Sequence, residues 1–152
     1  ETDKPGATEQ FYDVGTRAKI IQLEVLQPTL FSIKVKGEGR FKIESANKGK
    51  YSLWNAVVSE IQDDDIVQLP KEVERLSHKL KEVLYLNKNK SQLSRAEISS
   101  INQRFEDSGW VANRWAELLP IDILQKQNLL EERDPMLRLR KIDHIIQGMN
   151  DL

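Results

Sequence analysis

Residues 29–45, TLFSIKVKGEGRFKIES, decide the fold of the first half of this chain. Apolar and polar side chains alternate in them, with Phe31, Ile33 and Val35 before two glycines and Phe41 and Ile43 after them. Because successive side chains of a strand point to opposite faces of a sheet, this alternation predicts strands with one buried face. The first half is therefore expected to be a β-sheet.

The other strands are predicted outward from this stretch. Gly37 and Gly39 can supply the positive φ of a short hairpin link, so we predict two strands joined there. RAKIIQLEVL (17–26) is a third strand, and its alternation slips at Ile20–Ile21, which indicates either a bulge or burial of both faces. YSLWNAVVSEI (51–61) is a fourth. No helical segment separates the four strands, so we expect an antiparallel meander.

The second half has a helical period, which begins after Pro70. Its helix boundaries carry clear local signals, and the helix that begins at Asp107 is expected to end at Pro120. The predicted starts are a capping box of Ser94 and Glu97 with a Leu93–Ile98 staple, a cap at Asp107, a box of Asp122 and Gln125, and Asp134 followed by Pro135. We expect an α+β protein with a β-rich part over 1–66 and a bundle of about five helices over 67–152.

Composition restricts the functions that the chain can have. Its 152 residues carry a formal net charge of −1, so no general field attracts phosphates or an acidic membrane. There are no cysteines, and no apolar run approaches the ~20 residues that span a bilayer. The first ten residues are polar and lack the features of a signal peptide. We expect a cytoplasmic protein that binds neither nucleic acid nor membrane.

Catalytic and metal-binding motifs are not apparent in the sequence. His78 and His144 have no second ligand at metal-binding spacing, and both are interpreted as polar-face helix residues. Gly49–Lys50 lacks the first glycine and the Ser or Thr of a P-loop. Asp63–Asp65 lacks the spacing of a calcium loop and is interpreted as a solvated linker. No catalytic residue, metal or cofactor is therefore predicted, and the chain is not expected to be an enzyme.

Two groups of motifs resemble the Lon protease N-terminal domain, the LON substrate-binding domain. FYDVGTRAKI (11–20) and KGEGRFKI (36–43) resemble its β-rich half, and KQNLLEERDPMLRLRKIDHII (126–146) resembles its helical half. KGKYSLW (48–54) and DSGWVANRWAELLP (107–120) are most similar to short bacterial members that consist of this domain only. The matching positions are Val14, Gly15, Thr16, Ala18, Ile20, Gly37, Arg40, Phe41, Lys126, Gln127, Leu129, Leu130, Glu131, Arg138 and Leu139.

The resemblance implies a PUA-like pseudo-barrel followed by a helical bundle, which recognises unfolded or partly folded polypeptides. The family's opening strands have no counterpart here, so the parent protein is expected to be longer, and an exposed edge could favour self-association. Lon's ATPase and protease domains also have no counterpart, so a separate protease is a candidate partner. The alternatives are RNA binding, which PUA-like barrels perform in other families, and a hydrolase with an unrecognised nucleophile.

The tryptophans and one turn supply the candidate contact residues. Trp115 shares a helical stripe with Val111, Leu118 and Leu119 and is expected in the core. Core is also favoured for Trp54, whereas Trp110 could equally cover a junction or line a groove. Near a turn, Leu26, Pro28, Leu30 and Phe31 form an apolar group. The candidate polypeptide-binding residues are Leu26, Leu30, Phe31, Trp54 and Trp110.

Overall fold

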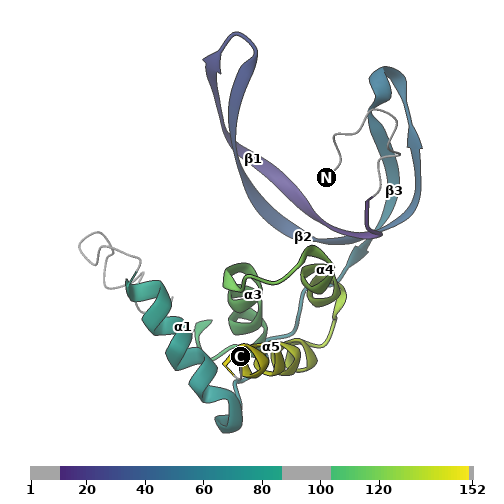
Figure 1. Cartoon of the computed structure of the whole chain (residues 1–152). Coiled ribbons are helices and arrows are strands. Elements are labelled where there is room, and N and C mark those ends of the chain that lie inside the picture. The colour runs from purple at the N-terminus through teal and green to yellow at the C-terminus, as the bar shows by residue number, and fades with distance from the viewer. Residues whose placement is uncertain (1–10, 87–103, 151–152) are drawn as a thin grey trace. The chain divides into compact units, whose positions relative to one another are not determined.

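The computed structural model describes residues 11–86 and 104–150 and is shown in Figure 1. Its contacts separate the chain into two compact units, residues 1–63 and residues 64–152. The described part of the first unit is a β-sheet, and the described part of the second is helical. The chain is therefore α+β, with the strands before the helices, as the change of period predicts.

The sheet has three antiparallel strands, β1 (Val14–Gln27), β2 (Leu30–Lys48) and β3 (Trp54–Ile61), in the order β1-β2-β3. The β1–β2 hairpin reverses at residues 28–29. A 3-10 turn, η1 (Lys50–Ser52), precedes β3, and there Tyr51 and Ser52 have positive φ values of 60° and 58°. The predicted antiparallel meander is thus confirmed.

The predicted hairpin link at Gly37 and Gly39 is wrong, because β2 runs straight through both residues. Gly37 lies opposite Ala18 and Gly39 opposite Arg17, which leaves Glu38 as an extra residue of β2. Gly39 has a φ of 140°, a value that glycine adopts without strain. The glycines therefore form a bulge, and the expected two strands are one.

The slip in the alternation at Ile20–Ile21 is also a bulge. Ile20 pairs with Val35 and Gln22 with Lys34, so Ile21 is an extra residue of β1. Neither isoleucine is buried. Of the two alternatives that the sequence left open, the bulge is confirmed.

The helical unit contains a 3-10 turn, η2 (Lys71–Val73), and four α-helices within the described ranges. The helices are α1 (Glu74–Leu86), α3 (Ser108–Leu118), α4 (Ile123–Glu131) and α5 (Pro135–Asn150). The predicted capping box at Ser94 and the staple of Leu93 and Ile98 lie outside the described residues.

Three predicted helix caps are confirmed. The carboxylate of Asp107 accepts a hydrogen bond from the Gly109 amide at 3.1 Å. Asp122 and Gln125 form the reciprocal capping box, with bonds of 2.7 and 3.2 Å. The carboxylate of Asp134 accepts from the amides of residues 136 and 137 at 2.8 and 3.2 Å. These caps satisfy amides that have no partner inside their helices.

The hydrophobic core of the described residues lies in the helical unit. Trp115 is buried there as predicted, and its indole N–H donates to the Leu76 carbonyl at 3.0 Å. The core consists of Val73, Leu76, Leu80, Phe105, Val111, Ala112, Trp115, Leu119, Leu129, Leu139, Ile142 and Ile146. Leu118, which the sequence places on the same stripe as Val111 and Leu119, is exposed. The helices thus bury one apolar face each, as their period predicts.

Candidate polypeptide-binding surface

The outer half of the β1–β2 hairpin has an apolar face that no described residue of the unit 1–63 covers. Directly paired residues of an antiparallel ladder lie on the same face of the sheet. Three such pairs, spaced along the hairpin, are entirely apolar, and their members are 53–65% exposed. We call them the hairpin apolar face: Ile20 with Val35, Leu23 with Ile33, and Val25 with Phe31.

The opposite face of the same hairpin half is polar. Gln22 pairs with Lys34 and Glu24 pairs with Ser32. The Gln22 amide donates to the Glu24 carboxylate at 2.5 Å, so these side chains satisfy one another at the surface. A hairpin that is polar on one side and apolar on the other is suited to contact with another apolar surface on one side only.

The structure brings three predicted site residues together at the hairpin turn. Phe31 belongs to the hairpin apolar face, and Leu30 precedes it and pairs with Gln27. Leu26 is the extra residue of a bulge between Val25 and Gln27. Leu26, Leu30 and Phe31 are each more than half exposed.

Trp54 is not a core residue, which corrects the prediction. It is 42% exposed, and the ring of Phe11 meets it edge-on with 4.9 Å between centroids. The Lys48 ammonium lies 5.2 Å from its ring centroid. Trp54 pairs with Lys48, which is at the opposite end of β2 from Leu30. The path along β2 between Leu30 and Lys48 is roughly 60 Å, at about 3.3 Å per residue. The structure does not join Trp54 to the hairpin turn.

Trp110, for which the sequence left two alternatives open, is half-buried within the helical unit. Its ring meets that of the buried Phe105 edge-on, with 4.9 Å between centroids, and it packs against the core. It lies in the unit of residues 64–152, whereas the other candidates lie in the unit of residues 1–63. Its contacts show a packing role.

Sequence reasoning missed most of the hairpin apolar face as a surface. The alternation of Leu23, Ile33 and Val35 was visible, and it was interpreted as a sign of burial. The alternation shows only that one side of a strand is apolar, and not whether another element covers that side. The one signal that could have drawn attention to this face was the shortage of predicted elements to pack on the sheet.

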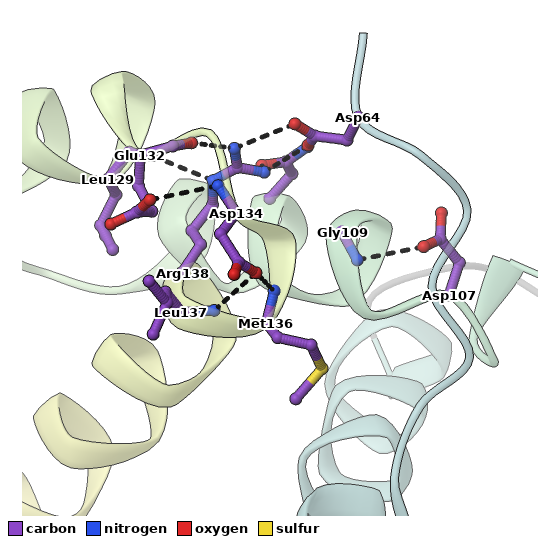
Figure 2. A network of polar contacts seen from close by, with 10 residues as sticks. Asp64, Asp107, Gly109, Leu129, Glu132, Asp134, Met136, Leu137 and Arg138 are labelled. Carbon is purple, nitrogen blue, oxygen red and sulfur yellow. Dashed lines mark hydrogen bonds and ion pairs between the residues drawn. The ribbon is translucent and has the colours of Figure 1, made fainter.

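A polar network around the buried Arg138 organises the helical unit, as Figure 2 shows. Its guanidinium donates to the Leu129 carbonyl at 3.0 Å, to Asn113 at 3.2 Å, and to both oxygens of Asp64 at 2.5 and 3.3 Å. It also donates to the Glu132 carbonyl. All five N–H groups of the side chain are thereby used.

This network corrects the interpretation of Asp63–Asp65 as a purely solvated linker. The Asp64 side chain is only 16% exposed because it pairs with Arg138. The sequence could not indicate this pairing, since the two residues are 74 positions apart. Asp64 therefore anchors the start of the helical unit to the start of α5.

Glu132 lies in a second ion pair, on an open groove between α4 and α5. Its carboxylate accepts a hydrogen bond from the Lys141 ammonium at 2.6 Å. This bond, together with the backbone amide of Asp134, lowers the pKa of Glu132 below its ordinary value, against a smaller opposing effect of desolvation. His144 also lines the groove and is exposed, as predicted for a polar helix face.

The described residues hold no group of three or more His, Asp or Glu side chains arranged to bind a metal ion. His78 is exposed and lies 3.7 Å from the Glu74 carboxylate, one helical turn away, which confirms its interpretation as a surface residue. In the same part of the chain, none of the helices combines the length and apolar character needed to cross a bilayer.

The fold of this chain, three antiparallel strands followed by helices, is similar to that of Lon N-terminal domains. The crystal structure of a Lon N-terminal domain protein from Xanthomonas campestris has a TM-score of 0.69 and 24% identity, and the match covers 86% of this chain and 66% of that one. The N-terminal domain of Mycobacterium avium complex Lon protease has a TM-score of 0.54 and 23% identity, with coverage of 91% and 72%. The fold is therefore that of a Lon N-terminal domain.

The sequence comparisons agree with this fold. The chain belongs to the family of the ATP-dependent protease La (LON) substrate-binding domain, whose family model matches residues 1–148. It is 30% identical over 146 residues to the Lon protease of Haemophilus influenzae and 28% identical over 151 residues to that of Rhizobium meliloti. These matches cover 95% and 97% of the chain but only 18% of each relative. The region shared with them is a substrate-binding domain and not a catalytic one.

Proposed function

We propose that this chain is a non-enzymatic recognition module that binds unfolded or partly folded polypeptides through the hairpin apolar face. The observation that carries the proposal is a row of three apolar cross-strand pairs, each more than half exposed, backed by a polar opposite face. Family membership in a substrate-binding domain supports the same function.

The chemistry of the surface fits such a ligand. Unfolded segments share apolar side chains and no common sequence, so a receptor for them needs apolar surface and not a pattern of directed polar groups. Full burial of a Val, Leu, Ile or Phe side chain contributes about 1.5–3 kcal/mol, so covering one that is half-buried contributes about 1 kcal/mol. The six side chains together would contribute on the order of 6 kcal/mol, which is comparable to the roughly 4–15 kcal/mol cost of association. Capture at micromolar concentration therefore needs contacts beyond these six side chains.

Three further features belong to the same proposal. The sheet forms part of a PUA-like pseudo-barrel, for which the bulges in β1 and β2 supply the curvature. The partners are unfolded polypeptides together with a separate protease or a second copy of this chain. The module acts in the cytoplasm, where such substrates arise without disulfides.

Binding to reduced, carboxymethylated α-lactalbumin tests the proposal, with fluorescence anisotropy as the readout. We expect the double variant Leu23→Asp, Ile33→Asp to bind at least tenfold more weakly, because two charges would enter the contact. The control is Asn47→Asp, an exposed change in the same sheet that adds a charge outside the face, and it should stay within twofold of the wild type.

Two outcomes would contradict the proposal. Unchanged binding by the double variant would exclude the hairpin apolar face as the contact surface. Absence of binding by the wild-type chain at several hundred micromolar would exclude the function itself. Competition by a single-stranded RNA, lost at high salt, would instead favour the nucleic-acid alternative.

A further inference from the structure

The outer edge of β3 is a second surface of the sheet with a distinct chemistry. On one side β3 pairs with β2, and among the described residues no strand pairs with it on the other side (Figure 1). In an antiparallel strand, every second residue directs its N–H and C=O away from the strand with which it pairs. In β3, alternate residues of Asn55–Glu60 therefore direct these groups away from β2. This edge therefore presents a short row of backbone donors and acceptors.

The two edges of the sheet differ in how well they could accept another strand. The β1 edge is interrupted by the extra residues Ile21 and Leu26. Bulges and cationic side chains are the devices by which proteins prevent strand pairing at an exposed edge. The β1 edge is thus protected against strand addition.

The β3 edge lacks these devices. The register shift between β2 and β3 lies between Ile43 and Ser45, so the extra residue is on β2 and β3 itself is continuous. Residues 55–59, NAVVS, include no lysine, arginine, proline or glycine, and Glu60 is engaged by Arg17 at 3.1 Å. A regular strand without protecting residues is what an added strand requires.

The side chains along this edge also define the kind of segment that would fit. Val57 is 65% exposed, and Val58, on the opposite face, is 38% exposed. A segment paired with β3 would contact apolar side chains on both faces of the sheet. An extended segment with small or β-branched side chains satisfies this, whereas a helix could not use the backbone groups.

We propose that the edge of β3 over Asn55–Glu60 binds an extended polypeptide segment by β-strand addition. This inference rests on the proposed function and specifies how part of the substrate is held. Main-chain hydrogen bonds do not depend on sequence, so they suit a receptor for substrates that share none. The hairpin apolar face and the β3 edge then recognise two different properties of an unfolded chain, its apolar side chains and its unpaired backbone.

The test uses a fluorescein-labelled, acetylated peptide of sequence Glu-Val-Thr-Val-Thr-Val-Glu and two N-methylated versions of it. Each version carries methyl groups on alternate amides, so that each blocks one edge of the extended peptide. We expect one version to bind the full chain at least tenfold more weakly and the other to bind within twofold of the parent peptide. Amide hydrogen exchange should show new protection at alternate residues of Asn55–Glu60.

A protein variant gives an independent check. Val57→Lys places a protecting cation on the β3 edge at a side chain that is already 65% exposed, so the sheet should still form. It should weaken peptide binding at least fivefold, while Ile66→Lys, at an exposed apolar position outside the sheet, should not change it.

The outcomes separate this inference from the proposed function. Equal binding of both N-methylated peptides, or protection confined to residues 20–35, would overturn strand addition. The same holds if α-lactalbumin binds and the peptide does not. If the Leu23→Asp, Ile33→Asp variant still binds α-lactalbumin more weakly than the wild type in these cases, the proposed function stands without strand addition. If the wild-type chain binds neither α-lactalbumin nor the peptide, both proposals fail.

Discussion

Replacement of Arg138 by alanine should strongly destabilise the helical unit. The side chain is 2% exposed and donates five hydrogen bonds, which connect α5 to Asp64, to Asn113 of α3 and to two carbonyls at the end of α4. Its removal takes away the guanidinium that pairs with the mostly buried carboxylate of Asp64. Breaking a buried ion pair in this way costs about 3–5 kcal/mol.

The measurement is urea unfolding of the full chain, followed by tryptophan fluorescence in a Trp54→Phe background. In that background the remaining tryptophans, Trp110 and Trp115, both report on the helical unit. Arg140→Ala is the matched control, because Arg140 is on the same helix and exposed, and it should change the free energy of unfolding by less than about 0.5 kcal/mol.

A double-mutant cycle identifies the origin of the loss. Asp64→Ala and Arg138→Ala should be coupled by at least about 1 kcal/mol, because each removes the other's partner. A loss below about 1 kcal/mol for Arg138→Ala would refute the reasoning, since an arginine that satisfies five acceptors in a buried site cannot be dispensable. A large loss with no coupling would show that the alkyl part of Arg138, and not the ion pair, stabilises the unit.

Three further changes should have smaller and distinct effects. Trp115→Phe removes the donor to the Leu76 carbonyl and should lower the free energy of unfolding by about 1–3 kcal/mol in the same urea assay; a loss below about 0.5 kcal/mol would show that this bond is unimportant. Lys141→Gln should raise the pKa of Glu132 toward its ordinary value, which a carboxyl NMR titration measures. Because the pKa of Glu132 is lowered in the folded state, the stability from the Glu132–Lys141 pair is present above the ordinary carboxyl pKa and is lost as pH falls through the folded pKa. The Lys141→Gln variant should therefore lose less stability than the wild type as pH falls through this range. Gly148→Ala should leave stability unchanged or raise it by up to about 1 kcal/mol, because a Cβ there meets no atom within 4 Å; destabilisation would indicate an unseen contact.

Local signals in the sequence predicted the helix starts well. Asp107, Asp122 and Asp134 each cap a helix as expected, because a cap depends on a side chain and amides only two or three residues away. The bulge at Ile21 was likewise one of two readings of a local change in alternation. Such features need no information from distant parts of the chain.

The candidate site was predicted less well. Leu26, Leu30 and Phe31 do lie together at an exposed turn, but Trp54 is exposed where burial was favoured, and Trp110 packs on the helical core. Whether these residues bind polypeptide stays a prediction. The main apolar surface was seen in the sequence only as an alternating pattern, since a strand carries no mark of what covers it.

The sequence by itself determined the order of strands and helices, the period of each element and the caps, because these follow from interactions within a few residues. Only the tertiary structure decided that the chain reverses at residues 28–29 and not at Gly37 and Gly39. Both stretches can leave the regular strand conformation, and the register of the paired strands selects between them. It also paired Asp64 with Arg138 across 74 positions and left one face of a hairpin apolar and open. Both are contacts between distant segments, or the lack of them, and a linear pattern does not contain that information.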